Sequence, residues 1–250
     1  EAGSQRLRDV INKGLTKENI LHGAGLAFEG GWNKVKLYFM LGQPTETVED
    51  MKAIGELAEE IAERYYEIPK DQRNGKCQIT VSTSFFVPKP FTPFQWSPMC
   101  TKDEFLGRAK INETIKSQLN KKSIRYNWHE ADVTMIEGIL ARGDRRLCDT
   151  MIKIYEKGGI FAAWSEFFDE QIWLDAFAED QIDTDFYTTR MRSEDELFPW
   201  DFIDAGVTKN FLLREWHAAN AETVTPNCRQ KCAGCGAMKY KGGVCYENKN

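Results

Sequence analysis

Four cysteines lie close together near the carboxyl end of the sequence: Cys228, Cys232, Cys235 and Cys245. Thiolates at such short spacings are typical ligands of a tetrahedral zinc ion or an iron–sulfur cluster. Glycines between them let the backbone turn tightly around a metal, and neighbouring basic residues favour the thiolate form. The sequence therefore predicts a metal site in this tail. The alternative is a disordered tail with free thiols.

The remaining cysteines, Cys77, Cys100 and Cys148, are scattered along the chain. This distribution does not match the disulfide framework of a small secreted domain. The sequence also has no apolar run long enough to cross a membrane and no signal peptide. We therefore expect a cytoplasmic protein with no membrane partner.

The charge of the chain is unevenly distributed. The formal net charge of -5 gives no general electrostatic case for nucleic-acid binding. Residues 166–185 contain eight acids and no lysine or arginine, whereas the last 23 residues contain five bases and one acid. Most such runs are solvated faces, so the charge pattern alone identifies no partner.

Residues 35–50 form the clearest folding unit. The apolar run at 35–41 predicts a strand that is buried on both faces, as in a parallel sheet. A glycine and a proline end the strand, and Thr47 with Asp50 predicts a helix that begins with a capping box. Ligands bind at the carboxyl ends of strands in such folds. The loop at 42–46 is therefore a candidate binding loop, with a simple connecting turn as the alternative.

The rest of the sequence continues as strands and helices and then becomes mainly helical. Helices are predicted at 4–14, 16–28, 101–120, 131–141, 145–157, 161–177 and 209–221, and further strands at 77–87 and 123–128. Asp144 is expected to cap the helix at 145–157. The many aromatic residues at 161–177 are expected to lie in the core.

Three blocks within the first 96 residues resemble parts of radical S-adenosylmethionine proteins. Residues 1–8, followed by 12–16, resemble the segment after the fourth strand of their barrel. Residues 38–47 resemble the fifth strand and its loop, and 86–95 resemble the exit of the sixth strand, especially in methylthiotransferase-like members. The rest of the chain resembles an uncharacterised subfamily whose full-length members carry an N-terminal cobalamin-binding-like domain.

This resemblance implies an α/β fold, the carboxyl-terminal half of a TIM-like radical S-adenosylmethionine barrel with parallel strands. It implies a partial barrel at 1–128, a helical region at 129–222 and a cysteine-rich, metal-binding tail at 223–250. The intact enzyme would use a 4Fe-4S cluster to cleave S-adenosylmethionine to a 5′-deoxyadenosyl radical, for hydrogen abstraction or group transfer. Its substrate is unknown, and the segment at 86–90 favours RNA or a ribosomal protein.

The resemblance also implies contacts with S-adenosylmethionine. Glu1 matches a carboxylate that holds the ribose hydroxyls, and Ser4 lies in the same block. Lys13 stands where relatives have an arginine near the methionine carboxylate, which keeps the charge but not the geometry. The backbone of Phe86 and Val87 matches the part of the site that borders the adenine.

The chain departs from the family in its cysteines. The spacing of Cys228, Cys232 and Cys235 is that of the catalytic cluster, but it lies at the carboxyl end, with Gly234 in place of an aromatic residue. We therefore interpret the tail as a second metal site. We expect an upstream N-terminal half of the same polypeptide to complete the enzyme, and no cleavage by this chain alone. The alternative is a non-enzymatic, zinc-ribbon-tailed α/β module that binds RNA or protein.

Overall fold

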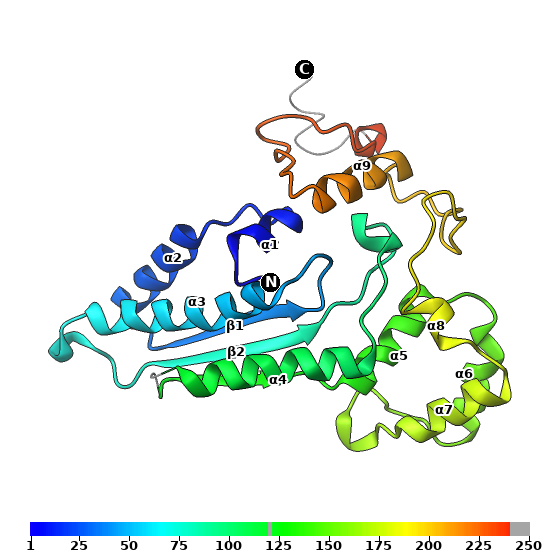
Figure 1. The fold of residues 1–250 in the computed structure, drawn as a ribbon, viewed down its shortest axis with the longest axis horizontal. Helices are drawn as coiled ribbons and strands as arrows, with labels where there is room; N and C mark the ends of the chain where they lie inside the picture. Colours follow the sequence, from blue (N-terminus) through cyan, green and yellow to red (C-terminus); the bar gives the residue numbers. More distant parts are fainter. Residues whose placement is uncertain (120–121, 241–250) are drawn as a thin grey trace. The chain divides into compact units, whose positions relative to one another are not determined.

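The computed structural model describes residues 1–119 and 122–240, and Figure 1 shows its elements. The strands are β1 (Lys34–Leu41), β2 (Gln78–Phe85) and β3 (Ile124–Trp128). The α-helices are α1 (Gln5–Val10), α2 (Lys17–Glu29), α3 (Val48–Glu67), α4 (Lys102–Gln118), α5 (Ala131–Arg142), α6 (Leu147–Glu156), α7 (Glu170–Glu179), α8 (Thr184–Tyr187) and α9 (Lys209–Asn220). Short 3-10 helices are η1 (Lys70–Gln72), η2 (Pro93–Trp96), η3 (Ser165–Phe167) and η4 (Ala237–Tyr240).

The three strands form one parallel sheet in the order β1-β2-β3. Leu41 lies opposite Phe85 at the carboxyl ends of β1 and β2, and Ile79 of β2 lies opposite Ile124 of β3. The helices α3 and α4 make the two crossovers between neighbouring strands. The predicted α/β class and the parallel direction of the strands are confirmed.

The strand β1 is not buried on both faces, and that prediction was wrong. Phe39 and Leu41 are buried, whereas Lys36 is exposed and Tyr38 is 60% exposed. Side chains alternate between the two faces of a strand. In this sheet one face of β1 is buried and the other stays accessible.

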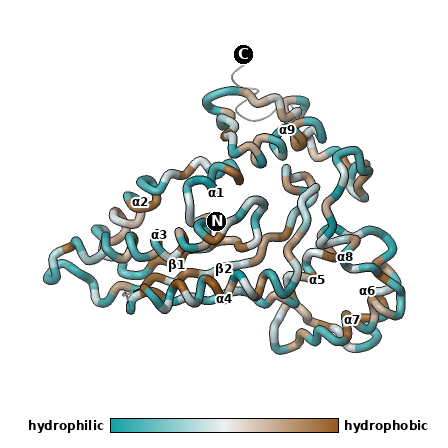
Figure 2. Tube along the Cα trace, in the orientation of Figure 1, coloured by the Kyte–Doolittle hydropathy of each residue, from teal (hydrophilic) through white to brown (hydrophobic). Residues whose placement is uncertain are grey.

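As the sequence predicts, side-chain hydrogen bonds cap the amino ends of α2 and α3. Thr16 and Thr47 each accept the backbone N–H of the residue three positions later, and both form reciprocal capping boxes, with Asn19 and Asp50. Apolar residues then recur at intervals along α3 (Figure 2). Its buried face includes Met51, Ile54, Leu57, Ala58, Ile61, Ala62 and Tyr65. No helix within the described ranges combines the length and apolar character that a membrane span requires.

The chain divides into two compact units, each built from separate segments. Unit 1 comprises Glu1–Phe86, Glu104–His129 and His217–Thr225, and it contains the sheet. Unit 2 comprises Val87–Asp103, Glu130–Trp216 and Pro226–Asn250. These boundaries differ from the three consecutive segments expected from the sequence, because the chain passes between the units several times.

Unit 2 contains two apolar clusters. The first joins α5, α6, α7 and α8 through Ile136, Ile139, Leu147, Ile154, Trp173, Ala176, Phe177 and Tyr187. The second gathers Trp96, Phe198, Trp200, Leu212 and Trp216. Two aromatic rings of the second cluster, Phe198 and Trp200, are stacked with their centroids 5.0 Å apart.

Two details of the helical region differ from the sequence prediction. The segment at 161–177 is not one helix: Phe161 has a positive φ of 58°, and α7 begins only after Asp169, whose side chain accepts the N–H of Gln171. Trp173 lies in the core as expected, but Phe161, Trp164 and Phe167 are exposed. Asp144 is not the N-cap of α6. The N-cap is Arg146, and the Asp144 carboxylate accepts the backbone N–H of Arg146 at 2.9 Å and pairs with its guanidinium.

Candidate functional site

The backbone of Glu1 pairs with the outer edge of β1. The Glu1 nitrogen donates to the carbonyl of Tyr38 at 2.8 Å, and the Met40 N–H donates to the carbonyl of Glu1 at 3.0 Å. Two such bonds on either side of Phe39 form the hydrogen-bond pattern of a parallel bridge. Glu1 is therefore held as the residue of a parallel neighbour of β1, close to the carboxyl end of that strand.

Two of the predicted cofactor residues contact each other at this edge. The Lys13 ammonium lies 2.8 Å from the Glu1 carboxylate, and both side chains are a little over two-fifths exposed. The Gln43 amide nitrogen donates to the Glu1 carbonyl at 2.9 Å. The other amide atom, the Gln43 Oε1, is buried and has no hydrogen-bond partner among the described residues. The cluster thus contains a charged pair and one buried acceptor that is unused.

Glu46 closes the loop that follows β1. Its carboxylate is 1% exposed, and it accepts hydrogen bonds from the N–H of Gly42 at 2.8 Å and from Arg108 at 2.7 Å. Burial raises the pKa of Glu46 to about 7, and the bonds from Gly42 and Arg108 only partly oppose that rise. Gly42 and Thr45 both have positive φ, of 82° and 66°. Glycine tolerates a positive φ, so only Thr45 is strained, and the bonds of the buried Glu46 carboxylate to Gly42 and Arg108 hold the loop in this shape.

Asp50 connects the start of α3 to the start of the chain. Its buried carboxylate accepts from the hydroxyl of Ser4, the guanidinium of Arg6 and the N–H of Thr47. Burial alone would raise the pKa of Asp50, but these hydrogen bonds together outweigh it and hold the pKa at about 2. The Ser4 oxygen also accepts the N–H of Leu7 and so caps α1. Ser4 therefore has a local structural use beside its predicted role.

The predicted residues after β2 are divided between the two units. Phe86 belongs to unit 1, is 7% exposed, and donates its N–H to the carbonyl of Leu41 at 2.8 Å. The loop at 42–46 and Phe86 follow the carboxyl ends of neighbouring parallel strands. Val87, which is also buried, is the first residue of unit 2.

The face of the sheet that carries Tyr38 is mostly polar. The register places Tyr38 opposite Ser82, and Ser82 opposite Asn127. Two residues closer to the amino end of each strand, the same face carries Lys36, Thr80 and Arg125. Tyr38 on this face is exposed, whereas Ser82 is buried, so only part of the face is accessible.

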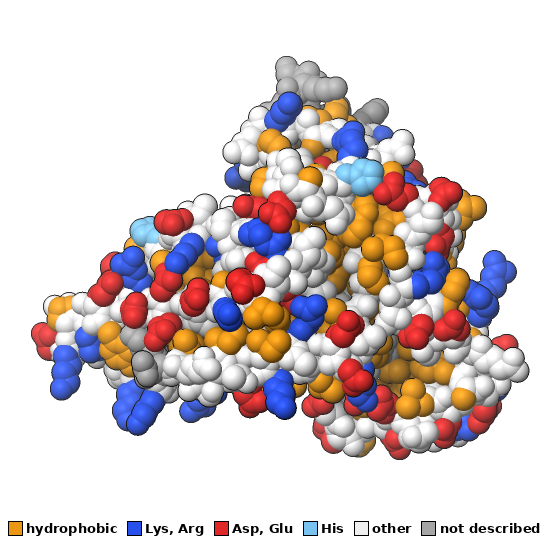
Figure 3. Space-filling view, in the orientation of Figure 1, with side chains coloured by type: hydrophobic (Ala, Val, Ile, Leu, Met, Phe, Trp, Pro, Cys, Tyr) orange, Lys and Arg blue, Asp and Glu red, His pale blue; other side chains and the backbone are white. Residues whose placement is uncertain are grey.

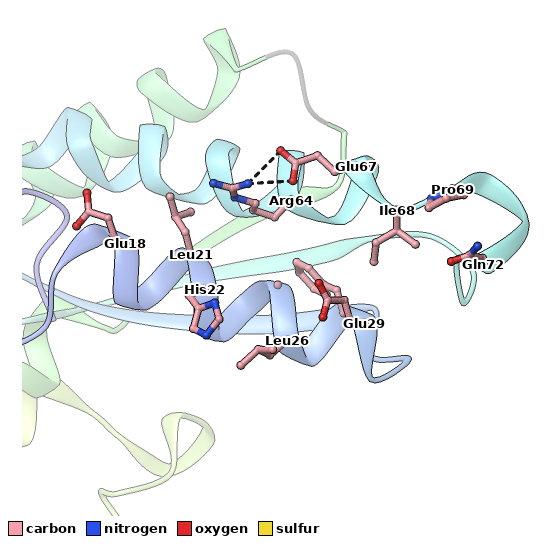
Figure 4. Close-up of a pocket in the computed structure, with 12 residues that line it drawn as sticks. Glu18, Leu21, His22, Leu26, Glu29, Arg64, Glu67, Ile68, Pro69 and Gln72 are labelled. Atoms are coloured by element: carbon pink, nitrogen blue, oxygen red, sulfur yellow. Dashed lines mark hydrogen bonds and ion pairs between the residues drawn. The ribbon is translucent and has the colours of Figure 1, made fainter.

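A cavity of unit 1 lies away from this cluster. It has a volume of about 710 Å³ and lies between α2 and the last turn of α3 (Figure 4). Its lining includes His22, Leu26 and Arg64, and Arg64 pairs with Glu67 at 3.0 Å. The part of α3 that lines the cavity begins at Arg64, near the far end of the helix from Val48, so the cavity is roughly 25 Å from the loop at 42–46. It does not form part of the same site.

The predicted metal tail lies only partly within the described residues. Cys228 and Cys232 are exposed and Cys235 is half-buried, and all three are free thiols. Cys245 lies outside the described residues. Across 1–119 and 122–240, no group of three or more potential ligands comes together around one point. Four thiols remain a donor set that suits zinc or an iron–sulfur cluster, so the metal site stays a prediction.

The structure adds residues that the sequence did not single out. Gln43 and Glu46 lie within the loop at 42–46, and Arg108 of α4 binds Glu46. Arg6 binds Asp50 and, at 2.6 Å, Glu222. Glu46 could have been suspected because it is a charged residue between a buried strand and a helix. Arg108 and Arg6 gave no such signal, because their partners are 62 and 44 residues distant in the chain.

Comparison with known proteins shows similarity over part of the chain. An uncharacterised protein of Methanocaldococcus jannaschii is 36% identical over 148 residues, which are 59% of this chain and 30% of the relative. The chain therefore matches less than a third of the length of that protein. No family model matches the sequence, and no solved structure matches it.

Proposed function

We propose that this chain is the carboxyl-terminal half of a radical S-adenosylmethionine enzyme. The observation that supports this most directly is the parallel pairing of Glu1 with β1, because it places the Glu1 side chain near the carboxyl ends of the strands. The archaeal relative, which extends well beyond the matched segment, is compatible with a larger polypeptide. The substrate class in this proposal is RNA or a ribosomal protein.

The residues present suit the polar ends of S-adenosylmethionine. The Glu1 carboxylate can accept from ribose hydroxyls, and the Lys13 ammonium can pair with the methionine carboxylate. The unused Oε1 of Gln43 offers a buried acceptor beside them. The backbone after β2, at Phe86, would border the adenine. When bound, a reduced 4Fe-4S cluster supplies the electron that cleaves S-adenosylmethionine to methionine and a 5′-deoxyadenosyl radical.

The chain alone should bind S-adenosylmethionine weakly. Glu1 and Lys13 already satisfy each other at 2.8 Å, so the ligand must replace that pair. Each hydrogen bond to a charged group contributes only about 1.5–3 kcal/mol, and ordering the ligand offsets much of this gain. In the family the cluster itself holds the amino and carboxylate groups of the cofactor, and this chain lacks the catalytic cluster motif.

The test compares the 250-residue chain with the longer polypeptide that includes its upstream segment. After anaerobic cluster reconstitution and addition of dithionite, the longer protein should form 5′-deoxyadenosine and the shorter chain should not. In the longer protein, Lys13→Ala should weaken S-adenosylmethionine binding by about tenfold, as measured by calorimetry. Lys34→Ala is the control, because Lys34 begins β1 at the opposite end of the strand.

Two results would count against this proposal. If the longer, reconstituted protein forms no 5′-deoxyadenosine, the binding-module alternative is favoured. If Lys34→Ala weakens binding as much as Lys13→Ala does, the cofactor is not held at the carboxyl end of β1.

A further inference from the structure

Three aromatic rings are exposed together in unit 2. Phe161, Trp164 and Phe167 are 63%, 55% and 56% exposed. The ring of Phe161 lies 5.9 Å from that of Trp164 and 6.0 Å from that of Phe167, measured between centroids. Large aromatic side chains gathered at a protein surface are typical of the centre of a binding interface.

The loop that carries these rings is anchored to the core beneath it. Ala162 and Phe168, from the same loop, pack against the apolar cluster of α5, α6, α7 and α8. Backbone hydrogen bonds close two successive turns of the loop. The Trp164 N–H donates to the Phe161 carbonyl at 3.0 Å, and the Phe167 N–H donates to the Trp164 carbonyl at 2.9 Å. The three rings therefore point outward from a fixed loop, and a partner need not order the loop in order to bind it.

The surroundings of the rings are strongly acidic. Residues 147–185 contain ten acids and only two lysines. Both lysines are already paired, Lys153 with Asp180 and Lys157 with Glu179. Figure 3 shows acidic side chains gathered over the part of unit 2 that carries α7. Such a field repels the phosphates of nucleic acids and of anionic membranes, and it attracts a basic partner.

The acidic residues adjoin the rings in the chain and on α7. Glu166 lies between Trp164 and Phe167 and is exposed, and Asp169 caps α7. The accessible side of α7 then carries Leu174, 44% exposed, beside Asp175. Exposed apolar and acidic side chains thus follow one another along residues 161–175. We name this set the acidic aromatic surface: Phe161, Trp164, Glu166, Phe167, Asp169, Leu174 and Asp175.

We propose that the acidic aromatic surface binds a protein segment rich in lysine or arginine that also carries bulky apolar side chains. The apolar side chains would cover the three rings, and the basic groups would face Glu166 and Asp175. This inference does not rest on S-adenosylmethionine chemistry. It applies equally to an enzyme that docks a basic protein and to a non-enzymatic binding module.

The test uses the full 250-residue chain and a labelled synthetic peptide of lysine and leucine arranged as an amphipathic helix. Fluorescence anisotropy should show binding that weakens as salt rises from about 50 to about 300 mM. The double variant Trp164→Ala/Phe167→Ala should reduce affinity by at least about tenfold. The double variant Glu166→Lys/Asp175→Lys should reduce it by a similar factor and remove most of the salt dependence.

Matched controls separate this surface from general effects. Phe202→Ala removes another ring of unit 2, one that is 85% exposed, and should leave affinity unchanged. Glu56→Lys makes one such charge reversal at an exposed position of α3 and should have little effect. Circular dichroism confirms that each variant is folded.

Four results would overturn the proposal. The first is absence of binding to the basic peptide, and the second is equal binding to a peptide with glutamate in place of lysine. The third is binding to a single-stranded RNA that is lost in the Trp164→Ala/Phe167→Ala variant, which would make the surface a nucleic-acid site. The fourth is a dimer of the unaltered chain that becomes monomeric in that variant, which would make a second copy the partner.

Discussion

The Glu46 carboxylate and the Arg108 guanidinium lie 2.7 Å apart and join the loop after β1 to α4. Because Glu46 is almost fully buried, its pKa rises from 4.5 to about 7 despite this partner. The folded protein therefore keeps a proton on Glu46 over a pH range in which the unfolded chain has lost it. Linkage then requires the free energy of unfolding to fall as pH rises from about 4.5 to about 7, and to level off above that range.

Replacement of Glu46 by glutamine should remove this part of the pH dependence. The two pKa values correspond to a change of roughly 3 kcal/mol across the range. Urea unfolding between pH 4.5 and 8 should give a flatter profile for Glu46→Gln than for the unaltered protein. Glu56→Gln, at an exposed position of α3, is the control and should leave the profile unchanged. Parallel profiles for Glu46→Gln and the unaltered protein would contradict the assignment.

Asp50→Asn should destabilise the protein at neutral pH. The variant loses the buried charge that pairs with Arg6 and accepts from Ser4 and Thr47, so we expect a loss of about 2–4 kcal/mol. The pKa of Asp50 is lowered from 3.8 to about 2 on folding, so its contribution is present above pH 3.8 and disappears as pH falls through 2.

The loss caused by Asp50→Asn should therefore shrink in acid, as followed by urea unfolding at pH 7 and near pH 2. The exposed Asp71→Asn is the control for a general charge effect. A loss of the same size at both pH values would show that the charge of Asp50 is not the cause.

Gly3→Ala should lower stability, whereas Gly23→Ala should not. A Cβ on Gly3 would lie 2.4 Å from the backbone nitrogen of Ile54, so the N-terminal segment would have to move away from α3. A Cβ on Gly23, within α2, would meet nothing within 4 Å, and alanine favours the helix by about 0.5–1 kcal/mol. Thermal unfolding should show a lower midpoint for Gly3→Ala and an unchanged or higher midpoint for Gly23→Ala. A similar midpoint for both variants would mean that the contact at Gly3 is loose.

The cysteine tail should bind one metal per chain. Elemental analysis of anaerobically purified protein should find close to one equivalent of zinc, or iron in the amount of one cluster, through Cys228, Cys232, Cys235 and Cys245. Zinc is slightly favoured. Cys235→Ser should remove most of the metal, whereas the exposed Cys148→Ser should not. Absence of both metals, or cysteine pairs found as disulfides under reducing conditions, would refute the site.

The local patterns of the sequence predicted much of unit 1. The apolar run of β1, the breaking residues after it and the capping box of Thr47 with Asp50 all act over a few residues, so the sequence alone reveals them. The register of β1 with β2 then brings together the loop at 42–46 and Phe86. Helical crossovers between parallel strands allow few other arrangements of these two segments.

Other features depended on contacts that no local pattern encodes. The exposure of Tyr38 depends on what covers the second face of the sheet. The pairing of Glu46 with Arg108 joins residues 62 positions apart. The segment at 161–177 has aromatic residues at helical spacing, yet Phe161 has a left-handed backbone and the helix begins only at Glu170. Aromatic content indicated burial, but the chain turns three of the rings outward.

The order in which the chain is synthesised determines when unit 1 can be completed. Arg6 pairs with Glu222 at 2.6 Å, and Asn12 accepts the N–H of Thr225 at 3.2 Å, so residues from both ends of the sequence complete one unit. A ribosome adds about 5–20 residues each second. Roughly ten seconds or more therefore pass between the synthesis of Arg6 and that of its partner Glu222. During synthesis, and in any product truncated before residue 217, Arg6 keeps Asp50 but lacks Glu222, and unit 1 is left incomplete.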